Sequence, residues 1–171
     1  MTVAERQAPR RHRTRLGRDF EDFVVGDVYE HRPGRTITEV DNTWFTLLTM
    51  NNHPAHFDVA YAAHTEFKKP LVNSTLTLAI VAGMSVTETS YRAIGNLGWK
   101  EVRLSNPVFA GDTLYAESEV LDKRLSKSRP GQGIVTIRTT GTKADGTVVI
   151  TFERSFLIAT AKAAVHASAN Y

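Results

Sequence analysis

Hydrophobic and polar positions alternate with a period of two through most of the chain after Tyr91. β-branched residues dominate this part, and both features are typical of strands that bury one face. Asp145-Gly146 is a strong hairpin signal between the last two of these strands. The alternation predicts an antiparallel meander with strands near residues 97–104, 113–124, 133–143 and 147–158.

Before the meander, apolar positions follow helical spacing instead. After a short strand at 28–31, a helix is predicted to begin at Asp41, a plausible N-cap. A second short helix is expected from Asp58 to Phe67, because Pro70 must end it or follow it closely.

The segment from Leu76 to Met84 is apolar on almost every side. A helix without a wide polar face is buried, so this helix is predicted to start at Asn73 or Ser74 and to be wrapped by the sheet. Its polar end, residues 85–90, is expected at the surface.

These elements predict an α+β fold in which a curved antiparallel sheet wraps one long buried helix. Trp44 and Trp99 are expected in the core. The far edge of such a sheet is free to pair with a second copy, so we expect a homodimer or a higher homo-oligomer.

The composition fits a single globular domain. The chain has 171 residues, 42% of them hydrophobic, and no cysteine. Disulfides, thiolate metal sites and a cysteine nucleophile are therefore excluded. No run of about 18 apolar residues occurs, so neither a membrane association nor secretion is expected, and the predicted location is cytoplasmic.

Basic charge is concentrated at the start of the chain. Residues 1–18 hold six arginines against one acid, and the remaining residues carry 15 basic and 17 acidic side chains. No broad basic surface for nucleic acid is expected. We predict a flexible Arg-rich tail at 1–19, one domain at 20–160 and a frayed end at 161–171.

Two imidazoles and two amides crowd the turn at residues 51–58, which Pro54 stiffens. Polar groups so placed between two helices, beside a buried helix, can bind a ligand or transfer protons. The spacing of His53, His56, Asp58 and His64 matches no zinc pattern, so no metal site is expected.

In this order the residues resemble the MaoC-like acyl-CoA hydratase/dehydratase family, whose members have the hot-dog fold. The resemblance covers residues 20–160. The family's loop reads D-x-N-P-x-H, followed by a Tyr-Ala pair, F-x-x-P, and H-G at the start of the buried helix. The corresponding residues here are Asn51, His53, Pro54, His56, Tyr61, Ala62, Phe67, Pro70, Asn73 and Ser74. A later N-P-V-x-x-G-D element matches residues 106–112.

The resemblance implies reversible hydration of a 2-enoyl-CoA to a 3-hydroxyacyl-CoA thioester, with no cofactor beyond the coenzyme A of the substrate. In the family, the loop aspartate and histidine activate a water, and a backbone N–H at the start of the buried helix binds the thioester oxygen. The match places His56 on the histidine and the Ser74 N–H on the oxyanion donor. It also places Asn51 where the aspartate belongs and His53 where asparagine is usual.

The replacement by Asn51 changes the chemistry that the loop can perform. An amide cannot accept a proton. His56 would then transfer protons nearly alone, or with help from His53, Asp58 or a group of a partner chain. The polar run at 73–75 predicts a short polar acyl group, such as a mesaconyl unit.

The nucleotide end of coenzyme A needs cations near the mouth of the site. Candidates are Lys68, Lys69, Lys123, Arg124, Lys127 and Arg129. Two other functions stay open: a non-catalytic acyl-CoA binding protein, and a hot-dog acyl-CoA thioesterase. A thioesterase commonly has a carboxylate on or near the central helix, where this chain offers Glu88 only toward the helix end.

Overall fold

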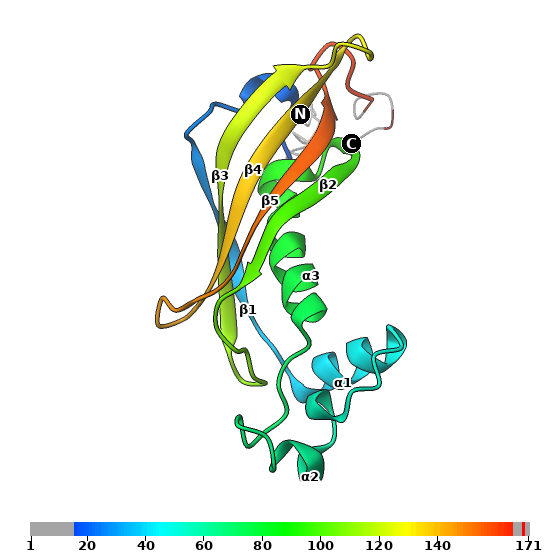
Figure 1. Cartoon of the computed structure of the whole chain (residues 1–171). Coiled ribbons are helices and arrows are strands. Elements are labelled where there is room, and N and C mark those ends of the chain that lie inside the picture. Colours follow the sequence, from blue (N-terminus) through cyan, green and yellow to red (C-terminus); the bar gives the residue numbers. More distant parts are fainter. Residues whose placement is uncertain (1–15, 166–168, 170–171) are drawn as a thin grey trace, which may run out of the picture.

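One five-stranded antiparallel sheet curves around helix α3 (Figure 1). The computed structural model describes residues 16–165 and 169. The sheet order is β1-β3-β4-β5-β2, with β1 (Val28–Thr36), β2 (Ala93–Leu104), β3 (Thr113–Leu125), β4 (Gln132–Lys143) and β5 (Val148–Ala159). The helices are α1 (Glu39–Leu48), α2 (Val59–Ala62) and α3 (Ser74–Met84), with short turns η1 (Phe20–Asp22), η2 (Pro54–His56) and η3 (Val86–Ser90). The predicted α+β hot-dog fold is confirmed.

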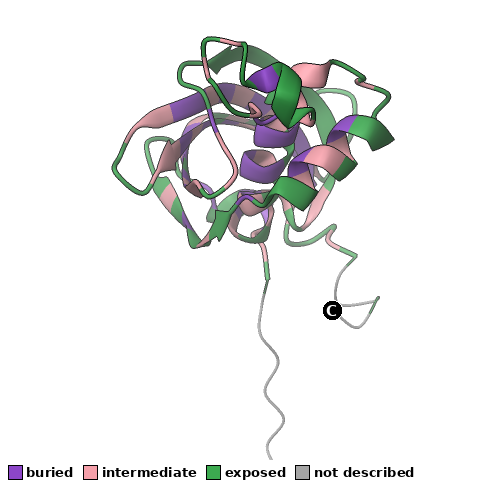
Figure 2. Cartoon of the chain, turned by 90° about the horizontal axis from the view of Figure 1, so that it is seen from below, coloured by how far each residue is buried: buried purple, intermediate pink, exposed green. Residues whose placement is uncertain are grey.

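Helix α3 lies in the concave face of the sheet, and much of it is buried (Figure 2). Its buried side chains form one cluster with those of the strands. Gly141 of β4 marks the closest approach of the two layers. A Cβ added at Gly141 would lie 2.8 Å from a methyl carbon of Val81. A larger residue there would push the helix off the sheet, so glycine at this point sets the depth at which α3 is buried.

A buried polar layer divides the core into two hydrophobic clusters. Along β3, Ser118 lies between Ala116 of one cluster and Val120 of the other. Its hydroxyl lies 2.8 Å from His31 Nε2 and 2.8 Å from Thr139 Oγ1. His31 is fully buried, so each of its ring nitrogens needs a partner, and Glu88 in η3 supplies the other one at 3.0 Å from Nδ1.

Arg154 of β5 extends this layer to the end of α3. Its guanidinium donates to Ser85 Oγ at 2.9 Å and to Thr89 Oγ1 at 3.3 Å. Burial lowers the pKa of Arg154 to about 10. The expectation that residues 85–90 lie at the surface is wrong for Ser85 and Thr89, which are buried and accept from this guanidinium.

The predicted helix boundaries need two corrections. Thr38, not Asp41, is the N-cap of α1. Asp41 lies at the third helical position and accepts from the Thr38 N–H at 2.9 Å, while the Asp41 N–H donates to Thr38 Oγ1 at 3.1 Å, which is a reciprocal capping box. Asp58 does cap α2, but this helix ends at Ala62 and does not reach Phe67.

The two tryptophans are not in the core. Trp44 on α1 is 74% exposed and Trp99 on β2 is 46% exposed. Other apolar side chains on the same elements are exposed as well, such as Leu48 and Leu97. Nothing in the described part of this chain covers these side chains.

Part of the predicted N-terminal tail packs on the domain. The Gly17 N–H donates to the Thr87 carbonyl at 3.0 Å, and Asp19 is buried. Residues 1–15 of the predicted tail, and 166–168 and 170–171 of the predicted frayed end, lie outside the described residues. Among the residues described, no helix combines the length and apolar character that crossing a membrane requires.

Candidate functional site

Residues 51–58, here called the histidine loop, lie between α1 and α2, beyond the first turn of α3 (Figure 1). Pro54 opens the short turn η2, and His53 caps it by accepting the Ala55 N–H at Nδ1, 3.2 Å away. The Ala55 carbonyl accepts from the Leu71 N–H at 3.0 Å, which fastens the loop to the segment that leads into α3. The loop is therefore held on both sides.

His56 has its two ring nitrogens in different environments. Nδ1 lies 2.8 Å from the Leu71 carbonyl oxygen. A carbonyl oxygen only accepts, so Nδ1 carries the proton and Nε2 keeps its lone pair. No hydrogen bond to Nε2 is found in the described part of the chain, and His56 lines a cavity of about 120 Å³. This imidazole is arranged to accept a proton at Nε2.

Asn42 holds the pieces of the site together. Its side-chain NH₂ donates to the His56 carbonyl at 2.7 Å and to the Leu71 carbonyl at 3.1 Å. Its Oδ1 accepts from the Asn73 N–H at 2.8 Å. One buried amide from α1 thus fixes the histidine loop and the start of α3. Sequence reasoning missed Asn42; its one signal was a polar residue inside an amphipathic helix.

The two other loop residues predicted for catalysis lie beside His56. The ring centroids of His53 and His56 are 5.9 Å apart. Asn51 Oδ1 accepts from the His53 N–H at 3.1 Å. Asn51 therefore uses its carbonyl oxygen to hold the conformation of the loop. His53 adds a second imidazole on the exposed side of the loop.

Ser74 opens α3, as the sequence predicted. Asn73 is the N-cap, and its Oδ1 accepts from the Thr75 N–H at 2.9 Å. The first N–H groups of a helix have no partner within it, and the helix dipole makes this end positive. Ser74 also lines a cavity of about 240 Å³ with Leu71 and Asn106. The Ser74 N–H is thus available for an oxygen that develops negative charge.

The predicted cations divide between the two ends of the sheet. Lys69 and Lys68 are both exposed, and Lys69 alone of the two lines the His56 cavity. Lys123 donates instead to backbone carbonyls of Phe20 and Glu21, at 3.3 and 3.4 Å, and to that of Phe23.

The other candidates lie with Lys123, near or in the turn after β3, at the opposite end of the domain from α2 (Figure 1). They are Arg124, Lys127 and Arg129. Within one chain, the structure brings Lys69 but none of these residues into the cavity with His56.

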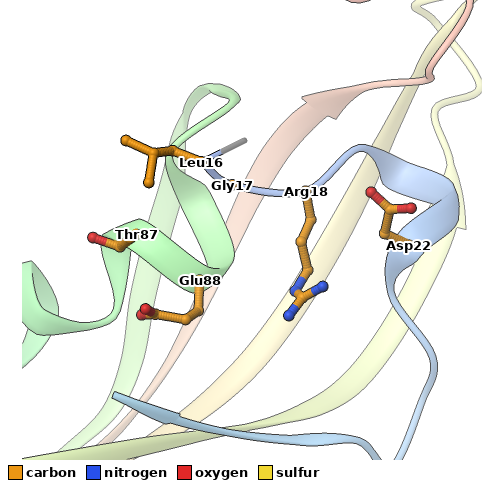
Figure 3. A pocket seen from close by; sticks show the side chains of 6 residues that line it. All are labelled: Leu16, Gly17, Arg18, Asp22, Thr87 and Glu88. Atoms are coloured by element: carbon orange, nitrogen blue, oxygen red, sulfur yellow. The ribbon is translucent and has the colours of Figure 1, made fainter. Parts of the chain in front are cut away.

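A larger cavity of about 350 Å³ lies at the other end of α3 (Figure 3). Arg18 and Asp22 line it from the N-terminal segment, and Thr87 and Glu88 line it from η3. Glu88 follows Ser74 by 14 residues, which corresponds to roughly 20 Å of helix. The carboxylate considered for a thioesterase is therefore remote from the histidine loop and pairs with His31.

The described residues contain no group of three or more histidine or acidic side chains that could hold a metal ion.

Comparison with known proteins places these features in a family. Residues 2–169 match the family model described as mesaconyl-CoA hydratase. The chain is 30% identical over 146 residues to the mesaconyl-CoA hydratase of Cereibacter sphaeroides, covering 85% of this chain and 42% of that protein. It therefore spans about two fifths of the length of the curated mesaconyl-CoA hydratases it matches.

Two solved structures have the same fold over most of the chain. A MaoC domain protein dehydratase from Chloroflexus aurantiacus aligns with a TM-score of 0.83 and 30% identity, over 88% of this chain and 43% of that one. A protein from Mycobacterium tuberculosis described as having a double hot-dog fold aligns with a TM-score of 0.78 and 25% identity, over 85% of this chain and 45% of that one.

Proposed function

The chain belongs to the mesaconyl-CoA hydratase family of MaoC-like hot-dog proteins, and we propose that it catalyses reversible hydration of a 2-enoyl-CoA thioester. The observation that carries the proposal is the His56 imidazole, whose Nδ1 is held by the Leu71 carbonyl while Nε2 remains available in a cavity. No cofactor is required, because the coenzyme A is part of the substrate.

His56 performs both proton transfers in this proposal. Nε2 takes a proton from water, the hydroxyl oxygen bonds to the β-carbon, and the π electrons of the double bond move onto the thioester oxygen as an enolate. The Ser74 N–H stabilises that oxygen. The imidazolium then returns its proton to the α-carbon, which restores the carbonyl and the neutral His56. One base is sufficient, so an aspartate at position 51 is not needed.

Asn51 has a positioning role in this scheme. Its Oδ1 accepts from the His53 N–H, 3.1 Å away, and so holds the turn that carries His56. The role differs from that of the family aspartate because an amide neither gains nor loses a proton under these conditions.

The size of the cavity favours a short acyl group. A cavity of about 150 Å³ holds a benzene-sized molecule, and the cavity beside His56 measures about 120 Å³. A four- or five-carbon acyl unit is comparable in size to this space. The mesaconyl group, a methyl-branched dicarboxylic unit, is the substrate we assign.

A second copy of the chain completes the assembly that we propose. β2 lies at the edge of the sheet with its far side unpaired, and it carries the exposed side chains Leu97 and Trp99. Pairing two β2 strands would satisfy the edge and bury these side chains. A monomer mass in sedimentation at micromolar concentration would contradict the homodimer. A cytoplasmic location stays a prediction.

The experiment that tests the function compares the wild-type chain with His56→Asn. The asparagine amide can still donate to the Leu71 carbonyl, so the loop keeps its anchor, but it has no base at the Nε2 position. We expect the hydration rate to fall by roughly 10²- to 10⁴-fold with an unchanged fold. Mesaconyl-CoA is the substrate, and loss of enoyl thioester absorbance together with a mass gain of one water reports the product.

The same incubation separates the other two functions. Release of free thiol would indicate a thioesterase, and tight binding without any chemical change would indicate a non-catalytic acyl-CoA binding protein. If His56→Asn retained more than about a tenth of the rate, the base would be another group.

A further inference from the structure

Of the residues that the structure describes, one lysine and no arginine line the cavity that contains His56. Lys69 lies in the segment that precedes α3, and its Nζ is 4.2 Å from the centroid of the Phe109 ring, which also lines the cavity. The face of the Phe109 ring attracts the Lys69 ammonium and so favours its position beside the cavity. No ion pair involving Lys69 is found between the residues that the structure describes.

The charged neighbours of Lys69 leave it available for an anion. Lys143 lies farther from the Phe109 ring, at 5.7 Å, and its ammonium pairs with Asp112 at 2.8 Å. Glu39 lines the cavity too, but it is the first residue of α1, where the helix N-terminus offsets its negative charge. Lys69 is thus the cation that a bound anion in this cavity would meet.

The proposed substrate carries an anion that would lie in the cavity that contains His56. In a thioester of methylfumarate, the free carboxylate is bonded directly to the carbon that is β to the thioester carbonyl. That carbon receives the water activated by His56. The carboxylate must therefore lie within a few bond lengths of the water, in the same cavity as the imidazole.

A carboxylate at the β-carbon also opposes the reaction unless a cation faces it. Hydration develops negative charge on the enolate oxygen, and the carboxylate adds a second negative charge two bonds away from the α-carbon. An ammonium beside the carboxylate offsets the repulsion. A neutral enoyl thioester has no such requirement.

Resting on the proposed function, we infer that Lys69 binds the free carboxylate of the acyl group and selects dicarboxylic enoyl thioesters. This role replaces the contact with coenzyme A predicted for Lys69 from the sequence. Lys68 has a different place: both lysines are exposed, but Lys68 does not line the cavity.

The test uses fumaryl-CoA and crotonyl-CoA, which differ only in carrying a carboxylate or a methyl group on the β-carbon. Lys69→Gln is expected to lower kcat/KM for fumaryl-CoA by roughly 10- to 150-fold, the effect of losing a hydrogen bond to a charged group. The value for crotonyl-CoA stays unchanged and so reports an intact fold. Lys69→Arg is expected to keep part of the preference for fumaryl-CoA over crotonyl-CoA, and the matched control Lys68→Gln is expected to keep all of it.

Three results would overturn the inference. An equal loss with both thioesters would mean that Lys69 serves the common part of the substrate or the fold. A loss that disappears when the same acyl groups are carried on N-acetylcysteamine, which lacks the nucleotide, would mean that Lys69 binds the coenzyme A phosphates. A wild-type chain that hydrates neither thioester would refute the proposed function itself, and the inference with it.

Discussion

Replacement of Asn42 by alanine tests whether one buried amide organises the site. The change removes the donor to the His56 and Leu71 carbonyls and the acceptor of the Asn73 N–H. The exposed fractions of Asn42 and Asn73 are 3% and 2%, so the Asn73 N–H would be left buried. The Leu71 carbonyl still accepts from His56 Nδ1, but the Asn73 N–H and the His56 carbonyl lose their partners.

The magnitude follows from those two groups. A buried polar group without a partner costs about 1–3 kcal/mol. Because His56 is only partly buried, its carbonyl belongs at the low end of that range, and the free energy of unfolding should fall by about 2–4 kcal/mol. The loop would also shift relative to α3, and a misplacement of about 1 Å can cost roughly 10²-fold in rate.

The assay combines urea denaturation with initial hydration rates. Asn52→Ala is the matched control, because Asn52 is an exposed asparagine of the same loop, and its stability should stay within about 0.5 kcal/mol of the wild type. Asn42→Asp adds a second comparison, since a carboxylate still accepts the Asn73 N–H but cannot donate to either carbonyl. If Asn42→Ala were as stable and as active as Asn52→Ala, the proposed role of the amide would be refuted.

Two further predictions concern proton transfer and pH. Asn51→Asp should leave the hydration rate little changed, because a carboxylate still accepts the His53 N–H and the proposed reaction needs no second base; a rate increase would identify Asn51 as a weakened catalytic position. Burial lowers the pKa of His31 below its ordinary value of 6.5, although Glu88 opposes the shift. Below about pH 6.5 the unfolded chain therefore binds a proton that the folded chain does not, and stability should fall as the pH decreases toward the folded pKa. His31→Gln should lack this part of the pH dependence in urea midpoints measured between pH 5 and 8, and parallel curves would contradict the assignment.

Local pattern was sufficient to predict the strands, the hairpin at Gly146 and the start of α3. Each of these is encoded within about a dozen neighbouring residues, by alternation, by turn chemistry or by an N-cap. The positions of Trp44 and Trp99 were predicted wrongly because an apolar side chain on the surface has the same character in the sequence as one in the core.

Features assembled from distant segments could not be read from the sequence. Asn42 meets Asn73 across 31 residues, and His31 meets Ser118 across 87. No spacing rule links such pairs, because their contact depends on how α1 and the strands pack. The same reason explains why the sequence grouped Lys69 with Lys123, which the fold places at opposite ends of the domain.

The Leu71 carbonyl determines more than the orientation of a ring. Since it occupies Nδ1 of His56, protons can enter and leave the imidazole only through Nε2. One atom that both removes a proton from water and delivers it to the α-carbon reaches only one side of a planar double bond. Hydrogen and hydroxyl must then add to the same face, and the product formed in heavy water would carry its deuterium syn to the new oxygen.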